Sequence, residues 1–254
     1  MSTERPDLAG RVAVVTGGSG SIGAATCRLF ARCRMRVAVV GRNEAVLDKV
    51  REQVWNGGGE AIAVRADVTD ADALDALRER VAAELGPVDV LAAFAGGNGA
   101  PRPSAELTAQ EWRQIVEGDL TGTFLTVRAF LPAMIERGRG SIITMASSAG
   151  RQPSQANVGY AAAKAGVVML TRHLAAELAP SGVRVNCIAP AAVHNAKMDA
   201  HMTPDQIAGL GRSFPLGRIG EPDDIAEAAA FLASDASSWV TGVTLDVAGG
   251  KVIP

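Results

Sequence analysis

A regular alternation of short apolar runs with longer helical patterns constrains the fold of this chain more than any other feature. Helical patterns follow the first two apolar runs and end at Arg32 and Trp55. Strands that alternate with helices form parallel sheets, and continuously apolar strands indicate that helices bury both faces of the sheet. The sequence therefore predicts a doubly wound α/β sheet. Its seven expected strands fall at residues 12–17, 36–41, 61–66, 88–96, 141–147, 183–190 and 243–250.

The length of the chain, 254 residues, suits one large domain. No repeat or low-complexity linker divides it, so we expect a single domain over residues 1–254. Two stretches show neither a strand nor a clean helical pattern, at residues 96–104 and 191–214. Each follows the carboxyl end of a predicted strand, where open α/β sheets bind ligands. We therefore expect both to form the wall of a substrate pocket, with residues 191–214 as its lid.

The composition excludes several classes of function. Hydrophobic residues make up 48% of the chain and charged residues 20%, with a net charge of −2, so neither disorder nor a nucleic-acid-binding surface is indicated. The polar N-terminus lacks a signal-peptide run, and no segment approaches the roughly 20 apolar residues of a membrane helix. Cys27, Cys33 and Cys187 show no CxxC spacing, which favours reduced, buried thiols. We expect a cytoplasmic protein without a metal site, whose partner is a small molecule or a second copy of the chain.

A glycine-rich turn, VVTGGSGSIGAA, follows the first predicted strand and opens a helix. Gly18, Gly20 and Gly23 have the GxGxxG spacing at which backbone N–H groups of a helix start can hold a pyrophosphate. The same spacing also occurs in glycine turns that bind no ligand, so the turn alone leaves both interpretations open.

The only tyrosine of the chain, Tyr160, precedes Lys164 by four residues in the segment VGYAAAKAG. On a helix these two residues share one face. A tyrosine that exchanges protons at neutral pH needs a nearby cation that favours the phenolate, and Lys164 supplies one. The spacing by itself also fits an ordinary surface pair. Its context is more specific, because Ser147 and Ser148 close a predicted strand shortly upstream.

Together these motifs resemble the short-chain dehydrogenase/reductase family, in particular its 3-oxoacyl-ACP reductase-like members. TGGSGSIG is similar to the family's TGxxxGxG turn, with Thr16, Gly17 and Gly23 in place and Ser21 where the middle glycine is usual. The resemblance implies a Rossmann-type fold and a nicotinamide cofactor. The cofactor contacts that it implies within the turn are Gly17, Ser19, Gly20, Ser21, Ile22 and Gly23.

The end of the second predicted strand bears on which nicotinamide cofactor binds. An NAD site usually carries Asp or Glu about 20 residues beyond the glycines, whereas Gly41 and Arg42 stand here. The missing carboxylate removes a repulsion, and a guanidinium can fork onto a 2′-phosphate. The sequence therefore favours NADP(H) over NAD(H). A solvated surface arginine and dual use of both cofactors are the alternatives.

The resemblance also implies roles outside the glycine turn. ADVTD is similar to the family's adenine-side motif, which implies cofactor contacts from Asp67 and Val68. Hydride transfer between the nicotinamide and a carbonyl carbon is expected, with Tyr160 as proton donor, Ser147 bonded to the carbonyl oxygen and Lys164 on the ribose hydroxyls. Further implied cofactor contacts are Ala95, Gly96, Tyr160, Lys164, Pro190, Val193 and Asn195, with Asn195 where threonine is usual.

The last part of the chain, from PLGRIG to VAGG, is similar to the family's C-terminal segment. In relatives this segment packs against another subunit, so the resemblance implies a homotetramer. A monomer in which the same helix covers the core is the alternative.

Two departures from the family's pattern concern the site. Phe94 stands within the segment that is usually NNAG, and Asp119, in EGDLTG, stands where an asparagine usually helps to hold a water of the proton relay. Near Lys164, Asp119 would favour the ammonium, and a water between the two would still relay protons. We take as a hypothesis that Asp119 acts catalytically in this relay. A tolerated replacement, a weaker reductase and altered substrate use are the alternatives.

The expected substrate pocket is mostly neutral. The residues expected to line it are Asn98, Gln152, Gln155, His194, Met198, Met202 and Phe214. The resemblance implies an NADP(H)-dependent oxidoreductase that reduces a ketone to an alcohol, with 3-oxoacyl, cyclic and secondary-metabolite carbonyls as candidate substrates. An imine reductase is one alternative. Another is a cofactor-binding protein with weak or no redox turnover, which Ser21, Phe94 and Asp119 suggest.

Overall fold

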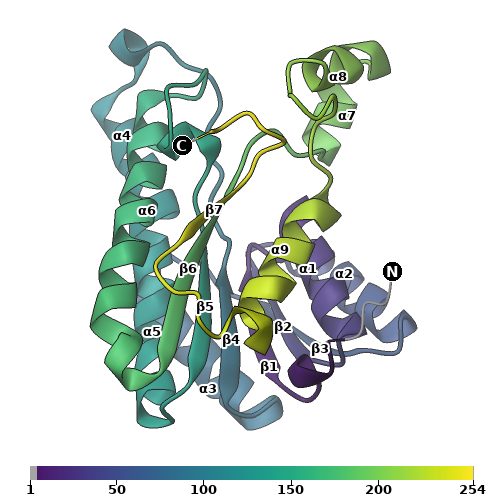
Figure 1. The fold of residues 1–254 in the computed structure, drawn as a ribbon, viewed down its shortest axis with the longest axis vertical. Coiled ribbons are helices and arrows are strands. Elements are labelled where there is room, and N and C mark those ends of the chain that lie inside the picture. The colour runs from purple at the N-terminus through teal and green to yellow at the C-terminus, as the bar shows by residue number, and fades with distance from the viewer. Residues whose placement is uncertain (1–4, 254) are drawn as a thin grey trace.

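The computed structural model describes residues 5–253 and is built around one parallel sheet (Figure 1). The strand order is β3-β2-β1-β4-β5-β6-β7. The strands are β1 (Val12–Thr16), β2 (Arg36–Gly41), β3 (Glu60–Arg65), β4 (Val88–Ala93), β5 (Gly140–Met145), β6 (Val183–Pro190) and β7 (Thr244–Val247). The predicted doubly wound α/β sheet is therefore confirmed. β4 ends three residues earlier than expected, because the backbone turns at Gly96 and Gly97, whose φ angles are +130° and +117°.

Helices cover both faces of the sheet (Figure 1). On one face lie α1 (Ser21–Arg32), α2 (Glu44–Asn56) and α9 (Pro222–Ala233), and on the other α3 (Ala71–Glu84), α5 (Gly122–Glu136) and α6 (Val158–Leu178). In β1, Val12 and Val14 belong to one core cluster, whereas Ala13 and Val15 belong to the other. Successive side chains of a strand point to opposite faces, so an entirely apolar strand fills both cores at once.

The order of the strands reverses direction at β1 and β4. The chain runs outward from β1 to β2 and β3, then returns to β4 and continues through β5, β6 and β7. In open α/β sheets, ligands bind outside the carboxyl ends of the strands at such a switch point. The topology therefore places a binding crevice beyond Thr16 and Ala93.

The segment 191–214 contains two helices that the sequence did not predict. They are α7 (Ala196–His201) and α8 (Pro204–Gly211), and they project from the sheet at the end where α4 (Ala109–Val116) also lies (Figure 1). Asn195 caps α7 through its side chain, and Thr203 forms a capping box with Gln206 at the start of α8. The expectation of irregular structure was wrong because these N-cap signals were not used.

Two expectations from composition concern burial. Cys27, Cys33 and Cys187 are all buried, as predicted. Burial raises the pKa of the Cys27 thiol to about 12. Within residues 5–253, no helix has both the length and the apolar character needed to cross a membrane.

Candidate active site

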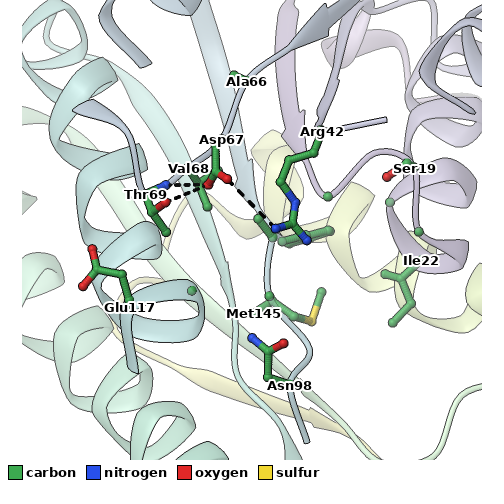
Figure 2. Close-up of a pocket in the computed structure, with 18 of the residues that line it drawn as sticks. Ser19, Ile22, Arg42, Ala66, Asp67, Val68, Thr69, Asn98, Glu117 and Met145 are labelled. Carbon is green, nitrogen blue, oxygen red and sulfur yellow. Dashed lines mark hydrogen bonds and ion pairs between the residues drawn. The ribbon is translucent and has the colours of Figure 1, made fainter. Parts of the chain in front are cut away.

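A pocket of about 810 Å³ opens at the carboxyl ends of five neighbouring strands, β1 to β5 (Figure 2). Each of these strands contributes its last residue or the residues that immediately follow it, and α4 with the turn after it closes one side. Eleven of the residues predicted to contact the cofactor line this pocket, namely Gly17, Ser19, Gly20, Ser21, Ile22, Gly23, Arg42, Asp67, Val68, Ala95 and Gly96. Their convergence follows from the parallel sheet, which brings the ends of all these strands to one edge.

The glycine turn presents the start of α1 to this pocket. Gly20 is the N-cap of α1, and no side chain caps the helix there, so its first N–H groups face the pocket without a side-chain acceptor. A Cβ at Gly23 would lie 2.2 Å from the carbonyl oxygen of Gly17, which shows how closely the turn packs. Ser21, the departure from the family's pattern, is the first residue of α1 and lines the pocket. These residues fit the pyrophosphate of a dinucleotide.

Asp67 lies at the opposite end of the pocket and is held in one orientation. Its Oδ1 accepts hydrogen bonds from the backbone N–H of Thr69 at 3.0 Å and from the Thr69 hydroxyl at 2.8 Å (Figure 2). The hydrogen bond from the Thr69 backbone is the main reason that the pKa of Asp67 lies below its ordinary value. Asp67 is therefore a fixed, ionised acceptor at the pocket edge, suited to a hydroxyl or an amino group.

Arg42 extends over the mouth of the same pocket. Its side chain is 80% exposed, and its Nη1 lies 4.0 Å from Oδ2 of Asp67 (Figure 2). Arg42 and Arg65 also line a second, adjoining hollow of about 770 Å³, together with Ser19, Glu44 and Asp48. Arg65 is the register partner of Gly41 across β2 and β3. The sequence missed Arg65, although its position at a strand end was the signal that identified Arg42.

Tyr160 and Lys164 lie on α6, where the ammonium of Lys164 is 5.6 Å from the centre of the Tyr160 ring. Asn157 caps α6 and accepts the backbone N–H of Tyr160 at 2.8 Å. Lys164 is almost fully buried, and its Nζ donates to the carbonyl oxygen of Met145 at 3.0 Å. Ser147 follows β5, and its hydroxyl oxygen accepts the backbone N–H of Ala149 at 3.2 Å. The lysine is thus held against the end of β5, one helical turn from the tyrosine.

Asp119 forms a buried ion pair with Lys164. Its Oδ1 lies 3.2 Å from Nζ of Lys164, and the two side chains are 0% and 3% exposed. The contact between the two charged groups is therefore direct, and the relay water stays a prediction. Asp119 lies in a π-helical turn, Glu117–Thr121, between α4 and α5. Such turns occur frequently at functional sites.

The remaining residues expected at the cofactor do not line this pocket. Pro190 ends β6 and is buried, and Val193 is buried where it bridges to Gly220. The Oδ1 of Asn195 accepts the N–H groups of Lys197 and Met198, and its Nδ2 donates to the carbonyl of Val193. The polar atoms of Asn195 are therefore used to start α7. Contacts of these residues with a cofactor remain predictions.

Of the seven residues expected at the substrate, Asn98 lines the main pocket. His194 is bonded instead to Asp199 at 2.8 Å and lies 3.6 Å from Glu221. Phe214 is buried, with the Lys251 ammonium 5.4 Å from its ring centre. Gln152 donates to the carbonyl of Lys251, Gln155 is exposed, and Met198 and Met202 are half-buried in and after α7. His194, Met198, Met202 and Phe214 lie in segment 191–214, and Gln152 contacts the chain after β7. The contact of these residues and of Gln155 with a substrate stays a prediction.

Sequence reasoning missed part of the pocket wall. The unpredicted lining residues are Gly41, Ala66, Thr69, Phe94, Arg113, Gln114, Glu117, Gly118 and Met145. Most of those on the sheet side follow strand ends, which was an available signal. Arg113, Gln114 and Glu117 lie at the end of α4, and an ordinary helical pattern gave no indication that this surface would face the strand ends.

A family model described as enoyl-(acyl carrier protein) reductase matches residues 17–251. The chain belongs to the short-chain dehydrogenase/reductase family. It is 43% identical to the cis-4-hydroxycyclohexanecarboxylate dehydrogenase of Sinomonas cyclohexanicum, over 96% of this chain and 97% of the relative. It is 35% identical to a 2,5-dichloro-2,5-cyclohexadiene-1,4-diol dehydrogenase of Sphingobium indicum, over 96% of each chain.

Solved structures agree with this assignment. A 3-oxoacyl-[acyl-carrier protein] reductase of Brucella melitensis with bound NAD is 34% identical, with a TM-score of 0.89 over 98% of this chain and 94% of that structure. The predicted family, including the likeness to 3-oxoacyl-ACP reductases, is therefore confirmed. This short-chain dehydrogenase/reductase is an oxidoreductase of a family that uses a nicotinamide cofactor, and its homologues act on hydroxyl or carbonyl groups of small molecules.

Proposed function

We propose that this protein is an NADP(H)-dependent oxidoreductase that interconverts a secondary alcohol on an alicyclic ring and the corresponding ketone. The observation that carries the proposal is the pair of Tyr160 and Lys164 on one turn of α6, with the lysine buried and fixed at the carboxyl end of the sheet. The ring substrate is supported by the names of two relatives, which specify a hydroxycyclohexane and a cyclohexadienediol.

The chemistry requires a proton donor beside a hydride donor. A nicotinamide bound in the main pocket would supply or accept the hydride. Tyr160 would give a proton to the carbonyl oxygen during reduction and take it back during oxidation, while the Ser147 hydroxyl would orient that oxygen. Lys164, fixed by Met145 and Asp119, would keep a positive charge beside the phenol and hold the ribose. No step needs a metal ion.

Two arginines support NADP(H) as the cofactor. Arg42 and Arg65 line the same hollow beside the end of β2, where Gly41 replaces the acidic residue of a typical NAD site. A guanidinium recognises a phosphate through paired N–H donors. Glu44 and Asp48 line the same hollow and limit its positive charge. We therefore propose that NADP(H) binds more tightly than NAD(H), and not that NAD(H) is excluded.

One set of assays tests both parts of the proposal. Cyclohexanol and its ring-substituted derivatives are offered with NADP⁺ and with NAD⁺, and a ketone panel of the corresponding ring ketones and of acyclic ketones is offered with NADPH and with NADH. Nicotinamide absorbance is followed for the wild type, Tyr160→Phe and Arg42→Ala. Losing the phenol should reduce turnover by about 10²–10⁴-fold. Arg42→Ala should weaken NADPH binding by roughly tenfold and NADH binding much less.

The matched control is Arg172→Ala, which removes an exposed arginine from α6 and should change neither affinity. Equal losses for NADPH and NADH in Arg42→Ala would contradict the cofactor preference. A wild-type enzyme that reduces acyclic ketones but no ring ketone would contradict the substrate class.

A cofactor-binding protein with little turnover is the second candidate function. The direct contact between Lys164 and Asp119 favours it, because a lysine neutralised by a buried carboxylate supports a neighbouring phenolate less strongly. Binding of NADPH without its oxidation across the whole ketone panel would support this candidate. The homotetramer and the cytoplasmic location are also proposals, and light scattering of the purified protein tests the former.

A further inference from the structure

The loop that follows β4, Gly96–Ala100, lies between the main pocket and the tyrosine of α6. We refer to these five residues as the glycine loop. Gly96 and Asn98 line the pocket, whereas Gly99 faces the ring of Tyr160. Three of the five residues are glycine, so much of the loop presents bare backbone.

Asp119 fixes one side of the glycine loop. Its Oδ1 accepts the backbone N–H of Gly97 at 2.7 Å, and its Oδ2 accepts the backbone N–H of Asn98 at 3.3 Å and the Asn98 side-chain amide at 2.8 Å. A carboxylate accepts at both oxygens, whereas an asparagine would turn one amide group toward these donors. The aspartate therefore joins the loop directly to Lys164.

Asn157 fixes the other side of the loop. Its Nδ2 donates to the carbonyl oxygen of Asn98 at 2.8 Å and to that of Ala100 at 3.0 Å. Its Oδ1 caps α6 by accepting the backbone N–H of Tyr160 at 2.8 Å. This asparagine is buried. One side chain thus sets the position of the glycine loop relative to the tyrosine.

Gly99 is the point at which the loop contacts the tyrosine. A Cβ at this position would lie 2.9 Å from both Cδ1 and Cε1 of the Tyr160 ring, closer than side-chain atoms approach one another. The φ of Gly99 is not in the positive range that favours glycine, so lack of space and not backbone geometry excludes a side chain here. Any larger residue must move either the loop or the ring.

We propose that the glycine loop is the specificity-determining wall of the substrate site, with Gly99 setting its distance from Tyr160 and Asp119 and Asn157 as its positioning residues. The side-chain-free backbone leaves a flat, uncharged edge along which a compact alicyclic ring can lie. The inference rests on the proposed function, because it specifies the ring substrate of that same site.

Two substitutions separate this role from general stability. Gly99→Ala adds one methyl group against the Tyr160 ring. Asn157→Ser keeps a good N-cap acceptor for α6 but removes both hydrogen bonds to the loop. Gly57→Ala is the control, because Gly57 also has a negative φ and a Cβ there would meet its nearest atom at an ordinary 3.4 Å.

The readouts are kinetic and spectroscopic. Turnover and KM are measured for cyclohexanol and for an acyclic secondary alcohol, and NADPH affinity is measured by fluorescence. Gly99→Ala and Asn157→Ser should lower kcat/KM for cyclohexanol on the order of tenfold or more, because small misplacements of a reacting group are costly. The acyclic alcohol should lose much less, and NADPH affinity should change less than kcat/KM for cyclohexanol.

The only tyrosine of the chain provides a second readout, because fluorotyrosine labelling gives one ¹⁹F resonance. This resonance should shift in Gly99→Ala and Asn157→Ser and stay in place in Gly57→Ala. An unchanged ratio of cyclic to acyclic kcat/KM, or an unshifted resonance in both loop variants, overturns the inference. A wild type without turnover on any alcohol refutes the proposed function instead, and the inference fails with it.

Discussion

Replacing Asp119 with alanine should destabilise the protein strongly, because it leaves the ammonium of Lys164 buried without a counter-charge. Lys164 and Asp119 are 3% and 0% exposed, and their charged atoms lie 3.2 Å apart. Removing one partner of a buried ion pair costs about 3–5 kcal/mol of the free energy of unfolding. The three N–H donors of Gly97 and Asn98 also lose the Asp119 carboxylate as their acceptor. Gly97 and Asn98 are exposed, so water can accept these hydrogen bonds instead.

The expected change is large enough for a simple thermal assay. For a domain of this size each kcal/mol shifts Tm by about 2–4 °C, so Asp119→Ala should lower Tm by roughly 6–20 °C. Asp119→Asn is the matched variant, because it keeps the size of the side chain and one acceptor oxygen. It should lose about 1–3 kcal/mol, since its amide group then faces a donor.

A double-mutant cycle with Lys164→Met separates the pair from the rest of the network. If the ion pair accounts for the loss, the free energies of unfolding should be non-additive, with a coupling of roughly 0.5–3 kcal/mol. Additive losses, or a Tm for Asp119→Ala within about 2 °C of the wild type, would refute the reasoning.

The same variants test the catalytic hypothesis for Asp119. Turnover is measured at a temperature at which every variant is folded, so that stability does not contribute. Asp119→Ala should then show a turnover number far below that of the wild type. An unchanged turnover number would show that Asp119 is structural only.

Two further predictions concern segment 191–214 and the glycine turn. The hydrogen bond to Asp199, with Glu221 nearby, raises the pKa of His194 above its ordinary 6.5. The stabilisation of segment 191–214 by protonated His194 should therefore be complete below pH 6.5 and be lost as pH rises through the raised pKa. Limited proteolysis of segment 191–214 should accordingly increase on going from mildly acidic to alkaline pH, and His194→Gln should remove this dependence. Gly23→Ala places a Cβ 2.2 Å from the Gly17 carbonyl oxygen, so calorimetry should show weaker NADPH binding and a lower Tm. Gly57→Ala is the control and should show neither change. Normal NADPH binding by Gly23→Ala would disprove the packing argument.

Several features followed from the sequence because they depend on neighbours along the chain. All seven strands were found from their apolar runs, since a strand buried on both faces needs apolar residues at every position. The glycine turn was found because a helix start after a strand is a local structure. Tyr160 and Lys164 were placed together by the pitch of one helix.

The tertiary structure alone decided the contacts between elements that are distant in the sequence. Asp119 contacts both Lys164 and the glycine loop because the π-helical turn that carries it packs between α6 and the loop that follows β4. Arg65 lies beside Gly41 because β2 and β3 pair in that register. Phe214 is buried and its ring lies near Lys251, which no local pattern indicated. Periodicity and local propensity specify which face of a helix or strand is buried, but not which other element covers that face. The sequence therefore identified the pair of Tyr160 and Lys164, whereas only the fold revealed the residues that surround this pair.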